Sequence, residues 1–149
     1  MRNVLMIVVL GGAISGQYPI GANALWWTGA AQTGPFCWGF SCTPQTGTLV
    51  RGESGTLHVR AEFQQPYVLG LSLTATRCLA VQGFYNQLVI DDPITIFATG
   101  SCSQGSPILS CPGGTDAIPI TIPLTLPVGA VFSIQGATGV PSFPGTLSA

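Results

Sequence analysis

The sequence contains no lysine and little charge of either sign. Charged residues make up 6% of its 149 residues, against about 25% in an average soluble domain. The four arginines and five acidic residues leave a formal net charge of -1. Proteins that bind nucleic acids neutralise phosphates with clustered Lys and Arg. The composition therefore excludes a nucleic-acid partner, and its 46% of hydrophobic residues excludes an intrinsically disordered chain.

A convincing amphipathic helix is missing as well, because 20 glycines and 12 prolines interrupt the chain at short intervals. The clearest apolar run is GTLHVRAEF, residues 55–63, whose alternation predicts a half-buried strand. Its expected inner face is Leu57, Val59, Ala61 and Phe63, and its expected outer face is His58, Arg60 and Glu62. Short strands separated by turn residues about every 8–12 positions are typical of β-sandwiches. We therefore predict an all-β fold, a single antiparallel β-sandwich of jelly-roll or Ig-like type.

Residues 117–130, AIPITIPLTLPVGA, combine a strand-like alternation with three prolines. Ile, Leu and Val share one parity, and Pro119, Pro123 and Pro127 share the other. Prolines at this spacing would break any helix, so they exclude a membrane-spanning helix here. In a strand they would remove N–H donors from an exposed edge, which hinders edge-to-edge aggregation. The segment is predicted to be an edge strand with an apolar inner face.

The N-terminus has the layout of an export signal. Arg2 precedes an apolar run from Val4 to Gly16, and the sequence ANA, ending at Ala24, fits a small-x-small cleavage site. We predict a signal peptide at residues 1–24 and the sandwich domain at residues 25–149. A cut nearer Gly16 is the alternative, and a buried strand or helix is the competing structural interpretation. The run is shorter than the roughly 20 residues of a membrane span, so we expect a secreted or cell-surface protein with no span in the mature chain.

All five cysteines lie in the expected mature part of the chain. An oxidising compartment favours disulfides, and an odd number leaves one cysteine unpaired. The short loops favour the pairs Cys37–Cys42 and Cys102–Cys111, which leaves Cys78 as a buried thiol on a strand. The sequence contains no C-x₂-C pair, so a zinc site is not indicated. We predict no metal and no cofactor.

Residues for catalysis are few. His58 is the only histidine, it is expected in mid-strand on an outer face, and no G-x-S-x-G motif accompanies it. Asp91 and Asp92 precede Pro93, which indicates a turn. Together with Asp116 they are the remaining candidates for calcium, but the D-x-D-x-D-G pattern is absent. The chain is predicted not to be an enzyme, and a hydrolase is the last of three functional hypotheses.

Aromatic residues gather in LWWTGAAQTGPFCWGFSC, residues 25–42. Trp26, Trp27 and Trp38 would form a sugar-stacking surface if they were exposed. If they were buried they would seal the core, since aromatic side chains bury the most surface. The leading hypothesis is a secreted, non-enzymatic structural or adhesion module of the cell surface or extracellular matrix, with another surface protein as partner. A carbohydrate-binding module that uses the three tryptophans, with a polysaccharide as partner, is the alternative.

Three segments carry a resemblance to a known class of domains. LGLS at Leu69–Ser72, RCLAV at Arg77–Val81 and IPLTLPVGAVFSIQ at Ile122–Gln135 are similar to strands of small secreted β-rich domains in bacterial exported and surface proteins. The similarity covers roughly residues 55–136, and Arg77 stands where a glycine is usual. The resemblance implies a small antiparallel sandwich with no assigned activity, and it adds no catalytic residue.

Overall fold

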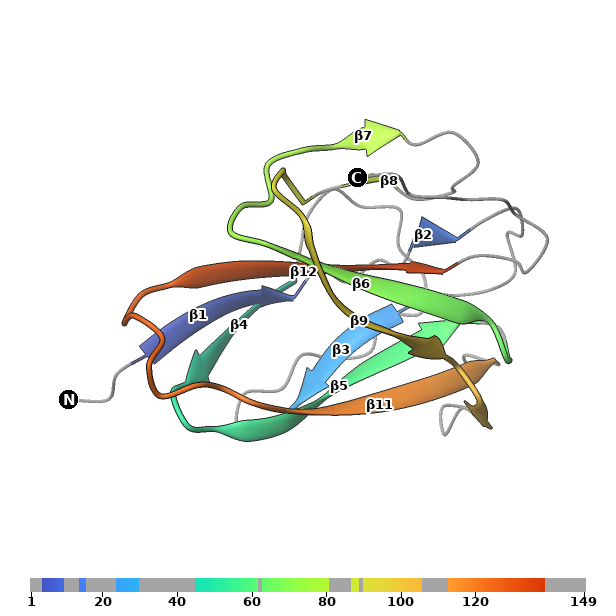
Figure 1. Ribbon diagram of the computed structural model, residues 1–149, viewed down its shortest axis with the longest axis horizontal. Coiled ribbons are helices and arrows are strands. Elements are labelled where there is room, and N and C mark those ends of the chain that lie inside the picture. Colours follow the sequence, from blue (N-terminus) through green and yellow to red (C-terminus); the bar gives the residue numbers. More distant parts are fainter. Residues whose placement is uncertain are drawn as a thin grey trace.

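The computed structural model describes residues 4–9, 14–15, 24–29, 45–61, 63–80, 87–88, 90–105 and 113–138, which form strands and no helix. The strands are arranged in two main sheets and one small two-stranded sheet (Figure 1). The fold is therefore all-β, as the sequence predicted. In chain order the strands are β1 Val4–Val9, β2 Ile14–Ser15, β3 Ala24–Thr28, β4 Gln45–Val50, β5 Ser54–Ala61, β6 Pro66–Ser72, β7 Leu79–Ala80, β8 Gln87–Leu88, β9 Thr95–Ser101, β10 Gln104–Gly105, β11 Gly114–Thr121 and β12 Val131–Thr138.

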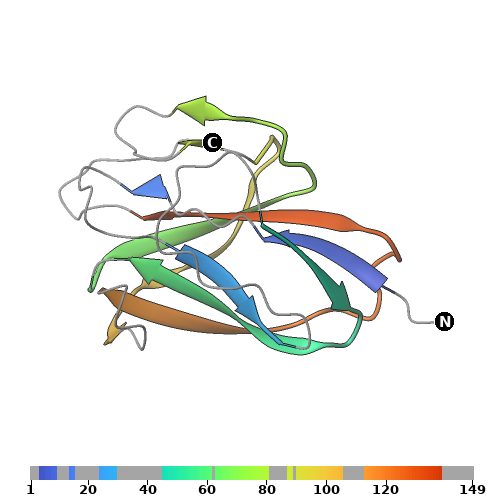
Figure 2. The same ribbon diagram turned by 180° about the vertical axis from the view of Figure 1, so that it is seen from behind.

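The larger sheet has the order β4-β1-β12-β6-β9, and β2 also pairs with β12. Its pairs are antiparallel except that β1 and β2 run parallel to β12. Figure 2 shows β1 beside β4 at one end of this sheet. Residues 4–9, which the sequence assigns to a signal segment, thus occupy a strand position between β4 and β12. This is the strand interpretation that competes with a cleaved signal, and cleavage stays a prediction.

The second sheet has four strands in the order β10-β11-β5-β3. Its central strand β5 pairs with β11 through eight residues and with β3 through five, all antiparallel. The two main sheets share one core, to which the four-stranded sheet contributes Leu25, Trp27, Leu57 and Val59, and the larger sheet contributes Leu49, Tyr67, Leu69 and Ile134. Burial of these side chains supplies the main driving force for packing the layers together.

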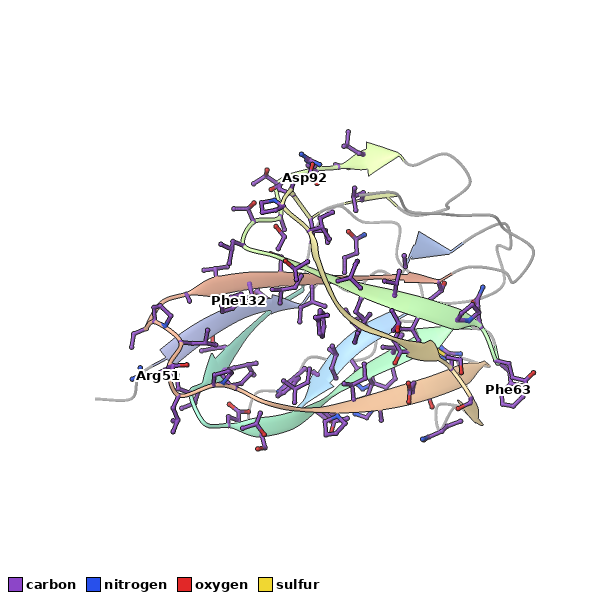
Figure 3. All side chains as sticks on the ribbon, viewed as in Figure 1. Arg51, Phe63, Asp92 and Phe132 are labelled. Carbon is purple, nitrogen blue, oxygen red and sulfur yellow. The ribbon has the colours of Figure 1, made fainter. Side chains whose placement is uncertain are left out.

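Two predictions about strand β5 are wrong. Phe63 is 59% exposed, because β5 ends at Ala61 and the chain turns at Gln64, which has a positive φ of 63°. Figure 3 shows Phe63 at the end of the molecule opposite Arg51. Arg60, expected on a solvated face, is fully buried. The inner positions Leu57, Val59 and Ala61 are buried as predicted.

A small additional layer covers part of the outer face of the larger sheet. Its centre is Ile90, which is 2% exposed and packs with Ala75, Leu88 and Ile94. Gly70 of β6 makes room for this layer, because a Cβ at Gly70 would lie 2.8 Å from Cγ2 of Ile94. The backbone N–H of Ile90 donates to Oε1 of Gln135 on β12 at 3.4 Å. The two-stranded β7–β8 sheet belongs to this layer (Figure 1).

The proline-containing segment is shorter as a strand than the sequence predicted. β11 ends at Thr121, so of the three prolines only Pro119 lies in it. The residues that follow form two turns, with hydrogen bonds from Leu126 N to Pro123 O and from Ala130 N to Pro127 O. Prolines fix φ and lack a donor, which favours these turns over a longer ladder. Within the turns Leu124 and Val128 are exposed, whereas Ile122 is buried.

Candidate functional site

The neighbouring tryptophans of β3 point to opposite faces of the sheet. Trp27 faces the shared core and is 3% exposed, and it packs so closely over Gly55 that a Cβ there would overlap its ring. Trp26 faces the other side and is 5% exposed. A ring that stacks on a sugar must present an open face, and neither ring does. Trp26 and Trp27 are therefore buried rather than exposed as a sugar-binding surface requires, and Trp38 lies outside the described residues.

His58 lies against Trp26 and Thr28. The rings of His58 and Trp26 are stacked, with centroids 4.8 Å apart and planes 9° apart. Nε2 of His58 is 2.8 Å from the Thr28 hydroxyl oxygen. Burial lowers the pKa of His58 below its ordinary value, which favours the neutral imidazole. His58, which the sequence pattern placed on an exposed face, thus links the edge strand β3 to β5 through these two contacts.

The two described cysteines, Cys78 and Cys102, are not in the states that the sequence predicted. Cys102 is a free thiol that is fully buried, so the predicted Cys102–Cys111 bridge is wrong. Cys78 is exposed and disulfide-bonded, so it is not the leftover thiol. Its partner lies outside the described residues, as do Cys37, Cys42 and Cys111. Short spacing suggests that two cysteines can meet, but it does not say which way each side chain points.

A polar group forms where β6, β9 and β11 approach one another. The Tyr67 hydroxyl donates to Oδ2 of Asp116 at 2.6 Å. Burial and this hydrogen bond to the carboxylate raise the pKa of Tyr67 well above its ordinary value. Burial and the charge of Asp116 raise the pKa of the Cys102 thiol to about 11. Both groups stay protonated at neutral pH, so this thiol does not have the lowered pKa that activates a nucleophilic cysteine.

Asp91 and Asp92 form ion pairs with one arginine. Arg77 Nε is 3.2 Å from Oδ1 of Asp91, and Arg77 Nη1 is 2.7 Å from Oδ2 of Asp92. Thr76 donates to Oδ2 of Asp91 through its backbone N–H and its hydroxyl, each at 2.9 Å. Both carboxylates therefore make contacts that stabilise the turn before β9. In the part of the chain that the structure describes, no group of three or more His, Cys, Asp or Glu is placed to hold a metal ion.

Strand β9, whose residues Thr95–Ser101 we call the β9 edge, is the surface that sequence reasoning missed. It lies at the end of the larger sheet, and among the described strands its ladder partner is β6. Ile96 is 54% exposed and Phe97 is 38% exposed. The register between β6 and β9 shifts at Leu69/Gly70, which makes Phe97 the extra residue of a bulge. The strand TIFATGS contains neither a charge nor a proline, and this was the signal available in the sequence.

A scan against protein-family models and searches of curated proteins and of solved structures found no match to this chain. The described residues also include no helix with the length and apolar character needed to cross a membrane. The functional argument therefore depends on the residues and contacts given above.

Proposed function

We propose that this chain is an exported, non-enzymatic structural or adhesion module of the cell surface or extracellular matrix. It is built as a β-sandwich of jelly-roll or Ig-like type, and it attaches to another surface protein by strand addition. The observation that carries the proposal is the β9 edge, an uncharged strand at the end of a sheet with Ile96 and Phe97 exposed. Addition of a partner strand to such an edge is a recurrent mode of protein recognition.

The β9 edge lacks charge and proline, two of the usual means of preventing such pairing. Natural edge strands carry Lys, Pro, inward-pointing charges or bulges to block edge-to-edge contact; TIFATGS has no charge and no proline, and its one such device is the bulge at Phe97. Asp91 and Asp92, which precede the strand in the sequence, both form ion pairs with Arg77. An incoming strand would therefore meet apolar side chains and backbone groups, with no unpaired charge to desolvate along the strand itself. The Phe97 bulge limits ideal pairing to part of the strand.

Export is supported by the N-terminal layout and by the cysteine chemistry. The apolar segment behind Arg2 matches a signal sequence, and a disulfide at Cys78 fits an oxidising compartment. The resemblance to secreted β-rich bacterial domains points the same way. Removal of the signal segment would also remove β1 and leave the facing edges of β4 and β12 without their present partner. A mature chain would then offer a second place for an added strand.

The two other functional hypotheses have less support from the described residues. The carbohydrate-binding hypothesis required open aromatic faces, and two of its three tryptophans are buried. The hydrolase hypothesis required a base next to a nucleophile and an acid, and among the described residues His58 contacts the Thr28 hydroxyl and the Trp26 ring but no Asp or Glu. Neither is proposed for this chain.

The proposal is tested by the location of the exported protein. We expect the full chain to be retained in the cell-surface fraction of the producing cells, and Ile96→Lys to release it into the medium, because a buried lysine in the added ladder would have to be desolvated. Leu124→Lys is the matched control, since Leu124 is 72% exposed but lies in the β11–β12 connection. Equal retention of the wild type and Ile96→Lys would exclude β9 as the contact. Release of the wild type as a free monomer would exclude an adhesive role.

A further inference from the structure

We propose that His58 is an acid-sensitive latch for the edge strand β3: protonation of its imidazole loosens β3 from β5 and uncovers Trp26. This inference goes beyond the proposed function and does not depend on it. The contacts of His58 with Trp26 and Thr28 carry it.

Strand β3 depends on β5 for its place in the sheet. Among the described strands its ladder partner is β5, through five antiparallel register pairs. His58 is opposite Trp26 in the middle pair of the five. A change in the charge of His58 therefore acts at the centre of the attachment of β3.

His58 contacts β3 on the face of the sheet opposite the shared core. Its ring is stacked on Trp26, with centroids 4.8 Å apart, and its Nε2 is 2.8 Å from the Thr28 hydroxyl oxygen. The stack covers one face of the imidazole, and the hydrogen bond occupies one of its two ring nitrogens. Both contacts keep water from the ring. A neutral imidazole fits such a site better than a charged one, because removing a charge from water costs free energy.

One charged side chain lies on the same face as His58 at the neighbouring described positions. It is Arg60, two residues further along β5 and fully buried. The other described residues at neighbouring positions of this face are uncharged, among them Trp26 and Thr28 on β3, Thr56 on β5, and Thr115, Ala117 and Pro119 on β11. Uncharged neighbours give little compensation for the desolvation of a charge, so they favour the neutral imidazole.

The carboxylates closest in register or sequence make other contacts. Asp116 is opposite Val59, and its carboxylate accepts a hydrogen bond from the Tyr67 hydroxyl in the shared core, on the other face of the sheet. Glu53 precedes β5 and accepts a backbone N–H of β4 at 2.9 Å. Glu62 lies outside the described residues, and the titration below includes its effect.

Two effects of protonation oppose each other at this site. A cation over an indole ring is attracted to it, whereas partial burial disfavours the charged form. Burial lowers the pKa of His58 below its ordinary value of 6.5, so the effect of burial is the larger one. The contribution of the neutral imidazole to the attachment of β3 is complete above pH 6.5 and is lost as the pH falls below 6.5. Acidification therefore favours detachment of β3, which exposes Trp26 and the edge of β5.

Proton NMR of the full chain measures the titration of His58 without ambiguity, because it is the only histidine in the sequence. We expect a midpoint below pH 6.5. A midpoint at or above pH 6.5 would overturn the inference, because protonation would then not weaken the attachment of β3.

Hydrogen exchange of the full chain at pH 7.5 and pH 5.5 measures the attachment of β3 itself. After normalisation by the intrinsic exchange rates, we expect the protection of β3 to fall several-fold at pH 5.5. The ordinary pKa of 6.5 sets an upper limit of about tenfold on this fall. The β6–β12 pair of the other sheet should keep its protection. Unchanged protection of β3, or an equal loss in both sheets, would overturn the inference.

His58→Gln is the matched variant, because glutamine can still hydrogen-bond to the Thr28 hydroxyl but does not titrate. We expect the normalised protection of β3 in this variant to be the same at pH 7.5 and pH 5.5. A loss at pH 5.5 as large as in the wild type would assign the acid effect to other groups and overturn the inference. The titration and exchange of the wild type decide the inference by themselves if the variant does not fold.

Discussion

Strands β9 and β11 each have an edge that is not fully paired, and the residues along these two edges differ in kind. Residues 116–121 of β11 pair with β5, whereas β10 covers only Gly114 and Thr115. That uncovered length carries Pro119, which has no N–H to offer, and polar Thr121. β9 carries exposed Ile96 and Phe97 and no proline. A proline in the β11 edge and none in the β9 edge fits the proposal that a partner strand pairs with β9.

The tightly packed and the exposed parts of these strands lie at different places. Where the end of β9 approaches β11, Gly114, Cys102 and the Tyr67–Asp116 hydrogen bond fill the space. Toward the start of β9, the side chains of Ile96 and Phe97 face solvent. Substitutions in the packed group should therefore lower the free energy of unfolding. Substitutions of Ile96 or Phe97 should instead alter association with a partner. Four predictions test this difference, beginning with the largest effect on stability.

The largest loss is expected from Gly114→Ala. A Cβ at Gly114 would overlap the backbone carbonyl oxygen of Cys102 and lie 3.0 Å from Cα of Phe63. Backbone atoms cannot rotate away, so overpacking should cost about 2–3 kcal/mol of unfolding free energy in urea denaturation. Gly105→Ala is the matched control, because its Cβ would meet nothing within 4 Å and it pairs directly with Gly114. Equal losses in the two variants would contradict the predicted crowding.

Alkaline pH should destabilise the fold through Cys102. The pKa of its thiol is raised from 9.0 to about 11, so the protonated form is favoured in the folded chain. The contribution of the protonated thiol to the free energy of unfolding is complete below pH 9.0 and is lost as the pH rises to about 11. This loss amounts to ~2–3 kcal/mol, at about 1.4 kcal/mol per pKa unit. Urea denaturation at several pH values measures how steeply the free energy of unfolding falls with pH. Cys102→Ala should reduce this slope, most clearly between pH 9.0 and 10.0, because the raised pKa of Tyr67 adds its own loss of stability above pH 10.0. An unchanged slope below pH 10.0 would assign the effect to other groups.

Tyr67→Phe should cost about 1–2 kcal/mol, because it removes the hydroxyl that donates to Asp116 and leaves that carboxylate without this donor. Thermal or urea unfolding measures the loss. A double-mutant cycle with Asp116→Asn isolates the pair from the separate effect of each residue. A coupling energy near zero would show that the hydrogen bond makes no net contribution.

The smallest effect on stability is expected at the β9 edge. Ile96→Thr changes an exposed side chain on an exposed strand and should alter the unfolding free energy by no more than about 0.5 kcal/mol. The same change should weaken retention at the cell surface, because it reduces the apolar area that a partner strand covers. A large loss of stability without a change in retention would reverse the proposed roles of β9 and β11.

Much of the fold was accessible from the sequence wherever a strand alternated regularly. The pattern of residues 55–61 predicted which side chains of β5 face the core, and Leu57, Val59 and Ala61 are buried there. The same pattern failed at Phe63 because parity holds only while the strand continues. The proline pattern of residues 117–130 gave an edge strand, but the turns after Thr121 shortened it.

The candidate site was less accessible. Ile96 and Phe97 belong to an apolar run that resembles any other strand, and exposure depends on their place at the end of the sheet. The tryptophans were visible as a cluster, but a sequence cannot show whether both faces of β3 are covered. Similarly, the state of Cys102 depends on the packing of its side chain against the Val59 carbonyl, 3.8 Å away.

By itself, the sequence determined that this protein is built from short strands without a helix in its described part, because frequent glycine and proline exclude helices and alternation selects strands. Composition also predicted that the chain has no nucleic-acid partner. The tertiary structure decided that Trp26 and Trp27 are both buried, that Cys102 is free, and that β9 lies at an edge. The reason is physical: alternation assigns a side chain to a face, but only the packing of distant segments decides whether that face is covered.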